Sequence, residues 1–303
     1  MRASPGILQG RGVRTPVDVV PTGVAVDEFR GGDGRSFRRR AGIPEDAFVI
    51  GHVGRLAEEK NLGFLARAVA RLLAAVPRAH FLVVGDGPAA DGIRRALAVV
   101  GATQRLHMPG KLVQPALADA YAAMDCFAFA SLSETQGMVL AEAMAAGLPV
   151  VALDAPGVRE VVDDGHNGRL LPHCDEAAFA SALGECVEAD VDTRRRWAQA
   201  VAETAERYSL ARCAERALAL YGELDGPEGQ AEEDQDLWHM SLRRIRAEWD
   251  LLKGMAQAAG SSLGDELRHR RDRPGYLSPG SVRRSRAIRR WRRRGPPGPS
   301  PRT

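Results

Sequence analysis

Several features that define common protein classes are scarce in this sequence. Its 303 residues include four cysteines and 5% aromatic residues. No apolar run approaches the roughly 18–20 residues of a membrane-spanning helix. The cysteines form no Cys-x-x-Cys pair, so we expect reduced thiols instead of a disulfide framework or a zinc site. The first twelve residues contain no hydrophobic run, which argues against a signal peptide and favours a cytoplasmic protein.

The small net charge of +3 conceals two parts of opposite sign. Residues 266–303 contain 13 Arg, no Lys and two acidic residues, a net charge of +11. The rest carries 29 basic and 37 acidic residues, a net charge of −8. The Pro, Gly, Ser and Arg content of residues 266–303 predicts a disordered tail whose charge is simply solvated. Attachment to an anionic membrane surface is the alternative interpretation, and no specific nucleic-acid partner is predicted.

Short apolar runs alternate with longer segments of helical spacing along most of the chain. The strand-like runs cover residues 48–53, 81–85, 105–108, 126–129, 150–153 and 169–171. The helical patterns cover residues 62–76, 89–100, 115–124, 137–146, 176–189, 193–207 and 210–224. This alternation predicts an α/β fold with a doubly wound parallel sheet, a Rossmann-like domain spanning residues 17–225. An additional strand is expected at residues 17–20. In such sheets ligands bind at the carboxyl ends of the strands.

Two further segments flank the predicted domain. Residues 1–16 are interpreted as the remnant of an interdomain segment. Residues 226–265 carry one apolar stripe, which predicts an amphipathic helix of about five turns. The stripe consists of Trp238, Leu242, Ile245, Trp249, Leu252 and Met255. We expect this helix to dock on a domain absent from the chain, and packing on the chain's own surface is the alternative.

The loop after the first predicted strand carries two cations. Gly54 permits close approach of a ligand to the backbone, and Asn61 is expected to cap the next helix. Arg55 and Lys60 lie between them, at the carboxyl end of a strand. Two cations there suit a diphosphate, although a solvated loop with incidental charges would have the same sequence.

A second loop combines carboxylates with a helix start. Gly137 is expected to begin a helix whose free amides and dipole favour an anion. Glu134 lies in the loop and Glu142 lies on the helix, and each carboxylate can accept hydrogen bonds from sugar hydroxyls. Two unrelated surface acids are the alternative, because such pairs are common.

Residues 134–152 closely resemble the E-x7-E segment of family-four retaining glycosyltransferases, which have the GT-B fold. The match covers roughly residues 17–221. Within it, the other signature motifs of the family occur in the same order along the chain as in the family. They are Pro21-Thr22-Gly23-Val24 with Phe29, Gly54-Arg55-Leu56 with Lys60-Asn61, Val84-Gly85-Asp86-Gly87-Pro88, Pro109-Gly110, Pro156-Gly157-Val158-Arg159-Glu160 and Gly165-His166-Asn167-Gly168.

The resemblance implies roles for individual residues. Arg55 and Lys60 would bind the diphosphate, Glu134 the donor sugar and Glu142 the ribose. The resemblance also implies contacts made by the backbone. Gly54 would let the chain approach the ligand closely, and the amides of Gly137, Met138 and Val139 would bind the phosphate or the sugar. The backbone at Met108, Lys111 and Leu112 would contact the nucleobase. The donor would be a UDP- or GDP-hexose. The family requires no metal or other cofactor, and the sequence has no convincing Asp-x-Asp metal motif.

The chain departs from the family pattern at its beginning. A complete GT-B enzyme has an acceptor-binding first half, of about 150–200 residues, a usual domain size. Only some 16 residues precede the first family element here. We therefore expect retaining hexosyl transfer, to an unknown lipid or glycan acceptor, to need an absent N-terminal half or a separate chain. A non-catalytic nucleotide-sugar-binding remnant is the main alternative. An RNA-binding protein fits only the basic tail.

Overall fold

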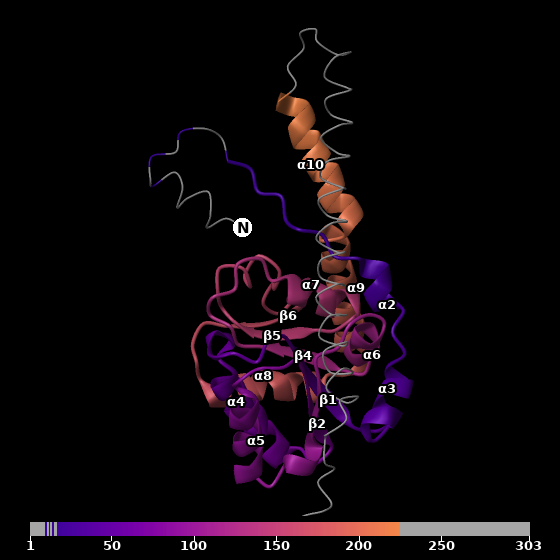
Figure 1. The fold of residues 1–303 in the computed structure, drawn as a ribbon, viewed down its shortest axis with the longest axis vertical. Coiled ribbons are helices and arrows are strands. Elements are labelled where there is room, and N and C mark those ends of the chain that lie inside the picture. Colours follow the sequence, from indigo (N-terminus) through magenta and orange to yellow (C-terminus); the bar gives the residue numbers. More distant parts are fainter. Residues whose placement is uncertain (1–9, 11, 13, 15–16, 225–303) are drawn as a thin grey trace, which may run out of the picture. The chain divides into compact units, whose positions relative to one another are not determined.

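The structure is a computed structural model that describes residues 10, 12, 14 and 17–224 (Figure 1). The predicted helix at 226–265 and the basic tail at 266–303 lie outside the described residues, as does most of the segment 1–16. Those three assignments therefore stay predictions. Within the described part, no helix combines the length and apolar character needed to cross a lipid bilayer.

Six parallel strands form one sheet in the order β3-β2-β1-β4-β5-β6. Their bounds are β1 Phe48–Val53, β2 Ala79–Val84, β3 Leu106–Gly110, β4 Cys126–Phe129, β5 Val150–Leu153 and β6 Gly168–Leu171. Four of them, β1, β2, β4 and β5, are almost wholly buried, because helices cover both faces of a parallel sheet. The predicted doubly wound α/β fold is confirmed, and each of the six strands expected between residues 48 and 171 is present.

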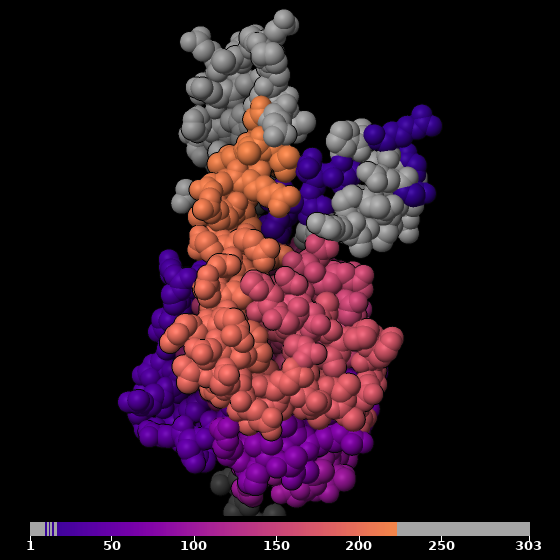
Figure 2. All heavy atoms as spheres, turned by 180° about the vertical axis from the view of Figure 1, so that it is seen from behind, coloured from indigo at the N-terminus to yellow at the C-terminus, as the bar shows by residue number. Residues whose placement is uncertain are grey.

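Helices pack on both faces of the sheet. One face buries apolar side chains of α4, α5 and α8, and the other buries side chains of α2, α3, α6, α7 and α9. Their bounds are α2 Val26–Arg30, α3 Gly34–Ala41, α4 Leu62–Ala75, α5 Ala90–Val99, α6 Ala116–Ala122, α7 Met138–Ala145, α8 Glu176–Glu188, α9 Val191–Arg207 and α10 Leu210–Leu224. Two short 3-10 helices cover Glu58–Lys60 and Thr103–Arg105. Figure 2 shows α9 and α10, in salmon and orange, along one side of the molecule.

The predicted strand at residues 17–20 is wrong. That segment has no regular structure, and Val24 makes only an isolated bridge with Ser209. The Val24 amide donates to the Tyr208 carbonyl at 2.7 Å, so the segment is held by the turn between α9 and α10 instead of by the sheet. Phe29 then turns inward against the Tyr121 ring, with centroids 5.5 Å apart. The sequence pattern also missed the short helices α2 and α3.

The side chain of His52 makes a hydrogen bond between the two central strands. β1 and β4 pair only through Ile50 with Cys126 and Gly51 with Phe127. One residue later, the His52 ring donates from Nδ1 to the Ala128 carbonyl at 3.1 Å. Since a carbonyl can only accept, Nδ1 carries the proton and Nε2 is left as an acceptor. Nε2 is the one buried side-chain polar atom without a partner among the described residues.

Acid should destabilise the fold through His52. Burial lowers the pKa of His52 from its ordinary 6.5 to about 4, the Ala128 hydrogen bond opposes the shift, and Lys60 adds to it. The native state therefore binds fewer protons than the unfolded state between these values. Stability is fully present above pH 6.5 and is lost as the pH falls toward 4. We expect a loss of about 2 kcal/mol at pH 5 relative to pH 7.5.

Urea unfolding at several pH values measures this loss. His52→Gln keeps a donor for the Ala128 carbonyl but cannot titrate, so its profile between pH 7.5 and 5 should be flatter than that of the unmodified chain. Burial also lowers the pKa of His80 and His107, whose ring nitrogens lie 3.0 Å apart, and this pair adds a smaller loss of the same sign to both proteins. Equal losses in both proteins would refute the assignment to His52.

Candidate functional site

A cavity opens where β1, β2 and β3 end. Its volume is about 390 Å³. The lining residues are Val53, Gly54, Arg55, Val84, Gly85, Asp86, Lys111, Leu112 and Leu117. The structure thus brings together four of the residues predicted from the sequence, namely Gly54, Arg55, Lys111 and Leu112. A mostly apolar wall with a few charged groups at its rim is typical of small-molecule sites.

Backbone contacts hold the three loops around this cavity. The Gly54 amide donates to the Val84 carbonyl at 3.0 Å, and the Gly85 amide donates to the Gly110 carbonyl at 2.9 Å. Gly85 has a φ of +139°, and a Cβ at that position would lie 1.8 Å from the Gly54 carbonyl oxygen. Only glycine fits so close a crossing of two loops. The cavity wall is therefore built largely from main chain.

Lys60 and Glu134 lie in the loops that follow the neighbouring strands β1 and β4, and their side chains form an ion pair. The Nζ of Lys60 donates to Glu134 Oε2 at 3.1 Å and lies 5.8 Å from the centre of the Phe129 ring. The Lys60 side chain is 24% exposed and that of Glu134 is 15% exposed, so water screens this ion pair only in part. The 3-10 helix Glu58–Lys60 positions the lysine.

The other carboxylate oxygen of Glu134 faces the amino end of α7. Oε1 accepts from the amides of Thr135 at 3.2 Å, Gln136 at 3.4 Å and Gly137 at 3.2 Å. Burial raises the pKa of Glu134, but the bond from Lys60 and the amides outweigh it, so the pKa lies below its ordinary value. Lys60, Glu134 and the amides of residues 135–137 are called the Lys60–Glu134 cluster below.

Gly137 fixes the direction of α7. It precedes the helix with a φ of +67°, and a Cβ there would lie 2.8 Å from the Gly157 carbonyl oxygen. The Gly157 amide in turn donates to the Glu134 carbonyl at 3.0 Å. Met138 and Val139 follow in the first turn of α7, and their partly buried side chains pack against the core.

Glu142 lies on α7 with a partner that the sequence pattern did not reveal. The Tyr121 hydroxyl on α6 donates to Glu142 Oε2 at 2.8 Å. Burial raises the pKa of Glu142, and the hydrogen bond from Tyr121 partly offsets the rise. The role predicted for Glu142, binding of ribose hydroxyls, stays a prediction. Tyr121 could have been found only from the packing of α6 on α7, since 21 residues separate the two side chains.

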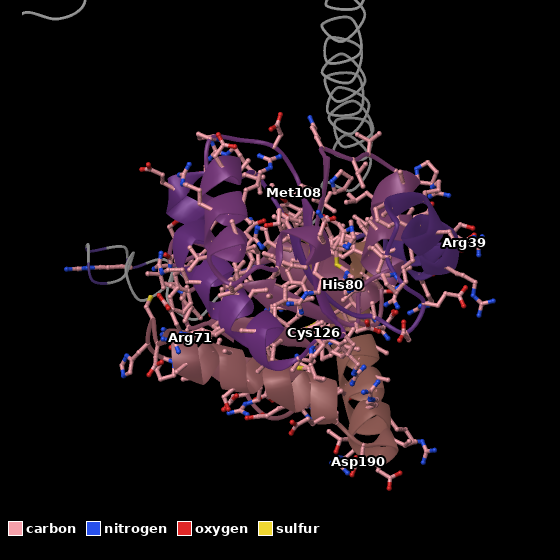
Figure 3. The ribbon with its side chains drawn as sticks, turned by 90° about the horizontal axis from the view of Figure 1, so that it is seen from below. Arg39, Arg71, His80, Met108, Cys126 and Asp190 are labelled. Atoms are coloured by element: carbon pink, nitrogen blue, oxygen red, sulfur yellow. The ribbon has the colours of Figure 1, made fainter. Side chains whose placement is uncertain are left out.

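The structure also shows the surroundings of three other predicted residues. Arg55 forms an ion pair with Glu59, and its side chain is 73% exposed. Met108, labelled in Figure 3, lies on β3 and packs against the core on the side of α4 and α5. It is not among the residues that line the cavity, and the nucleobase contact of its backbone stays a prediction. The predicted capping role of Asn61 is wrong. Asn61 directly precedes α4, but it has a left-handed φ of +53° instead of the extended backbone of a capping residue and makes no side-chain cap. Its Nδ2 faces Cys174 Sγ at 3.7 Å.

The chain is similar in sequence to known glycosyltransferases. Residues 47–189 match the family model described as glycosyl transferases group 1. The D-inositol 3-phosphate glycosyltransferase of Stackebrandtia nassauensis is 36% identical over 217 residues, covering 68% of this chain and 48% of the relative. The one from Kribbella flavida is 35% identical over 215 residues, covering 68% and 50%. The chain thus spans about half the length of the curated relatives it matches.

Solved structures share the same fold. HepE of Anabaena, in complex with UDP and glucose, is 25% identical with a TM-score of 0.64, covering 73% of this chain and 61% of HepE. Sucrose-phosphate synthase of Thermosynechococcus elongatus is 24% identical with a TM-score of 0.61, covering 73% and 56%. The family match, the curated relatives and the six-stranded sheet agree with one another. The chain therefore carries a group 1 glycosyltransferase domain, with a Rossmann-like fold that matches GT-B glycosyltransferase structures.

Proposed function

We propose that this domain binds a UDP- or GDP-hexose and supports retaining transfer of the hexose to an acceptor held by another domain or chain. The Lys60–Glu134 cluster carries this proposal. It places a lysine, a carboxylate and the backbone amides that precede α7 together at the carboxyl ends of β1 and β4. A diphosphate suits the lysine and the amides, and a sugar hydroxyl suits the carboxylate.

The neighbouring cavity supplies the remaining part of a nucleotide site. Lys111 and Leu112 line it together with Arg55. A nucleobase fits an apolar wall between loops, and Arg55 at its rim can leave Glu59 for a phosphate. The relatives support the same class of donor, because structures of HepE contain UDP with glucose and UDP-glucose.

The chemistry follows from where charge develops. Breaking the anomeric C–O bond leaves the electron pair on the diphosphate and positive charge on the sugar. Lys60, Arg55 and the α7 amides then stabilise the leaving group more strongly than the bound donor. The acceptor hydroxyl forms the new bond on the same face of the sugar and passes its proton to the departing phosphate. No protein nucleophile is required.

Isothermal titration calorimetry with UDP, GDP and ADP tests the donor proposal. We expect one of the uracil or guanine nucleotides to bind, and the matching nucleoside without phosphates to bind far more weakly. If none of the three nucleoside diphosphates bound at millimolar concentration, the proposal would fail. Binding without any hydrolysis or transfer of a bound nucleotide sugar, even with an acceptor domain added, would favour the non-catalytic alternative.

The basic tail offers a second contact, with anionic lipid. Residues 266–303 carry a net charge of +11, and each basic residue near a negatively charged bilayer contributes about 1 kcal/mol. We expect flotation of the full chain with phosphatidylserine vesicles at low salt and release at high salt. A chain ending at residue 265 is the control. Equal flotation of both chains, or none at low salt, would discard the tail as an anchor.

A further inference from the structure

One anion at the candidate site is part of the protein itself, namely the Glu134 carboxylate. Four donors converge on the Glu134 carboxylate, namely Lys60 Nζ and the three amides of residues 135–137. A lysine together with several backbone amides of a loop that leads into a helix is a donor set that suits a phosphate. The carboxylate therefore occupies a position suited to a phosphate.

This occupation differs from ordinary helix capping. The residue preceding α7 is Gly137, which has no side chain, and Glu134 lies three residues earlier. Its hydrogen bonds to the amides are 3.2–3.4 Å long, at or beyond the upper end of the usual range. The shorter contact is with Lys60, which comes from a different loop 74 residues away. The carboxylate is thus held by long, weak amide contacts and by one cation that a ligand can also use.

We propose that Glu134 is an internal competitor of the donor phosphate and that its displacement makes the site prefer a nucleotide sugar over the free nucleoside diphosphate. This inference rests on the proposed function. A phosphate that binds Lys60 beside the carboxylate gains less from it, because two anions then share one cation and repel each other. In this proposal a nucleoside diphosphate gains the full contact with Lys60 only when the bond from Lys60 to Glu134 is broken.

The two ligands differ in what the displaced carboxylate gains. A nucleotide sugar presents hydroxyl groups, which donate to Glu134 once it leaves Lys60. A nucleoside diphosphate has no sugar at that position, so the carboxylate gains only water. For a nucleotide sugar, the hydrogen bonds from the sugar hydroxyls offset the free energy needed to move the carboxylate away from Lys60. For the nucleoside diphosphate left after transfer, nothing in the ligand offsets that cost. Glu134 would therefore weaken retention of the spent nucleotide after transfer.

Glu134→Gln tests this mechanism with the full chain. The amide keeps the shape of the side chain but cannot neutralise Lys60. We expect UDP and inorganic pyrophosphate to bind roughly tenfold more tightly in calorimetry, a gain of about 1.4 kcal/mol. The preference for UDP-glucose over UDP should fall at the same time. If guanine nucleotides bind the unmodified chain better, GDP and GDP-mannose replace the uracil pair.

Glu185→Gln is the matched control. Glu185 lies near the end of α8, away from the carboxyl ends of the strands where the site lies. The substitution removes an ion pair with Arg169 and leaves the residues of the site unchanged. It should leave all three affinities unchanged. Glu134→Ala provides a second variant, which removes the contacts to the amides as well and should also gain affinity for pyrophosphate. Adding Lys60→Ala to Glu134→Gln should abolish the gain, because the two residues act through one contact.

The outcomes separate the two proposals. If the unmodified chain binds no nucleoside diphosphate, the proposed function fails and this inference fails with it. If the unmodified chain binds UDP but both Glu134 variants bind UDP and pyrophosphate equally or more weakly, only the internal competition is wrong. A gain in both Glu134 variants that also appeared in Glu185→Gln would show a general charge effect, and would equally overturn it.

Discussion

Lys60→Ala should weaken the binding of the preferred nucleoside diphosphate by about 1.5–3 kcal/mol, the value of a hydrogen bond to a charged group. The Lys60 side chain is only partly exposed, so its bond to a phosphate would be screened less than a surface ion pair. Breaking its 3.1 Å bond to Glu134 offsets part of the gain in the unmodified chain. We therefore expect the lower part of this range, which calorimetry measures as a loss of at least tenfold in affinity.

Arg94→Ala is a suitable control for this loss. Arg94 is an exposed cation on α5 whose described ion pair is with Asp91 of the same helix. The substitution Arg94→Ala removes one positive charge, as Lys60→Ala does, but lies outside the candidate site, so the affinity for the nucleotide should not change. An equal loss in Arg94→Ala would reduce the effect to long-range electrostatics. An unchanged affinity in Lys60→Ala would remove Lys60 from the phosphate site.

Gly85→Ala should destabilise the domain by about 3–5 kcal/mol, since overpacking and a strained backbone add together. The new Cβ would lie 1.8 Å from the Gly54 carbonyl oxygen, which belongs to the main chain and cannot rotate away. The φ of +139° adds strain for any residue with a side chain. We expect lower stability in urea unfolding followed by circular dichroism, together with loss of nucleotide binding.

Gly101→Ala separates these two causes. Gly101 has a φ of +67°, yet a Cβ there would meet nothing within 4 Å. It should cost only about 1–2 kcal/mol, the penalty for the left-handed conformation. If both variants lost a similar amount of stability, the backbone where Gly85 crosses Gly54 would move easily to make room for the new Cβ. The cavity wall would then not be as rigid as we describe.

The sheet was readable from the sequence because its strands are buried on both faces. Runs such as residues 48–53 and 126–129 are apolar almost throughout, and apolar helix spacing separates them. The short helices α2 and α3 escaped prediction for the opposite reason. α2 has five residues and α3 buries only Phe37, so neither repeats an apolar pattern often enough. The strand expected at residues 17–20 failed because an apolar run alone does not show whether a neighbouring strand edge is free.

Several residues of the candidate site could be predicted from the sequence, but the side chains with which they interact could not. Loop position and family resemblance indicated Lys60, Glu134 and Glu142. Their partners depend on the order of strands in space, which places β4 beside β1 and brings Glu134 to Lys60. The pairing of Tyr121 with Glu142 depends likewise on the packing of two helices. The unpartnered nitrogen of His52 was not foreseen, because it depends on where one ring lies between two strands.

The main-chain frame of the cavity has a consequence for how such domains can change their ligands. The loops after β1, β2 and β3 are tied to one another by peptide groups, as in the bond from Gly85 to Gly110. Replacing Arg55, Lys111 or Leu112 alters the chemistry of the wall but removes none of these ties. New base or sugar preferences can therefore arise by exchanging a few side chains on an unchanged scaffold, whereas a single methyl group at position 85 would damage the scaffold itself.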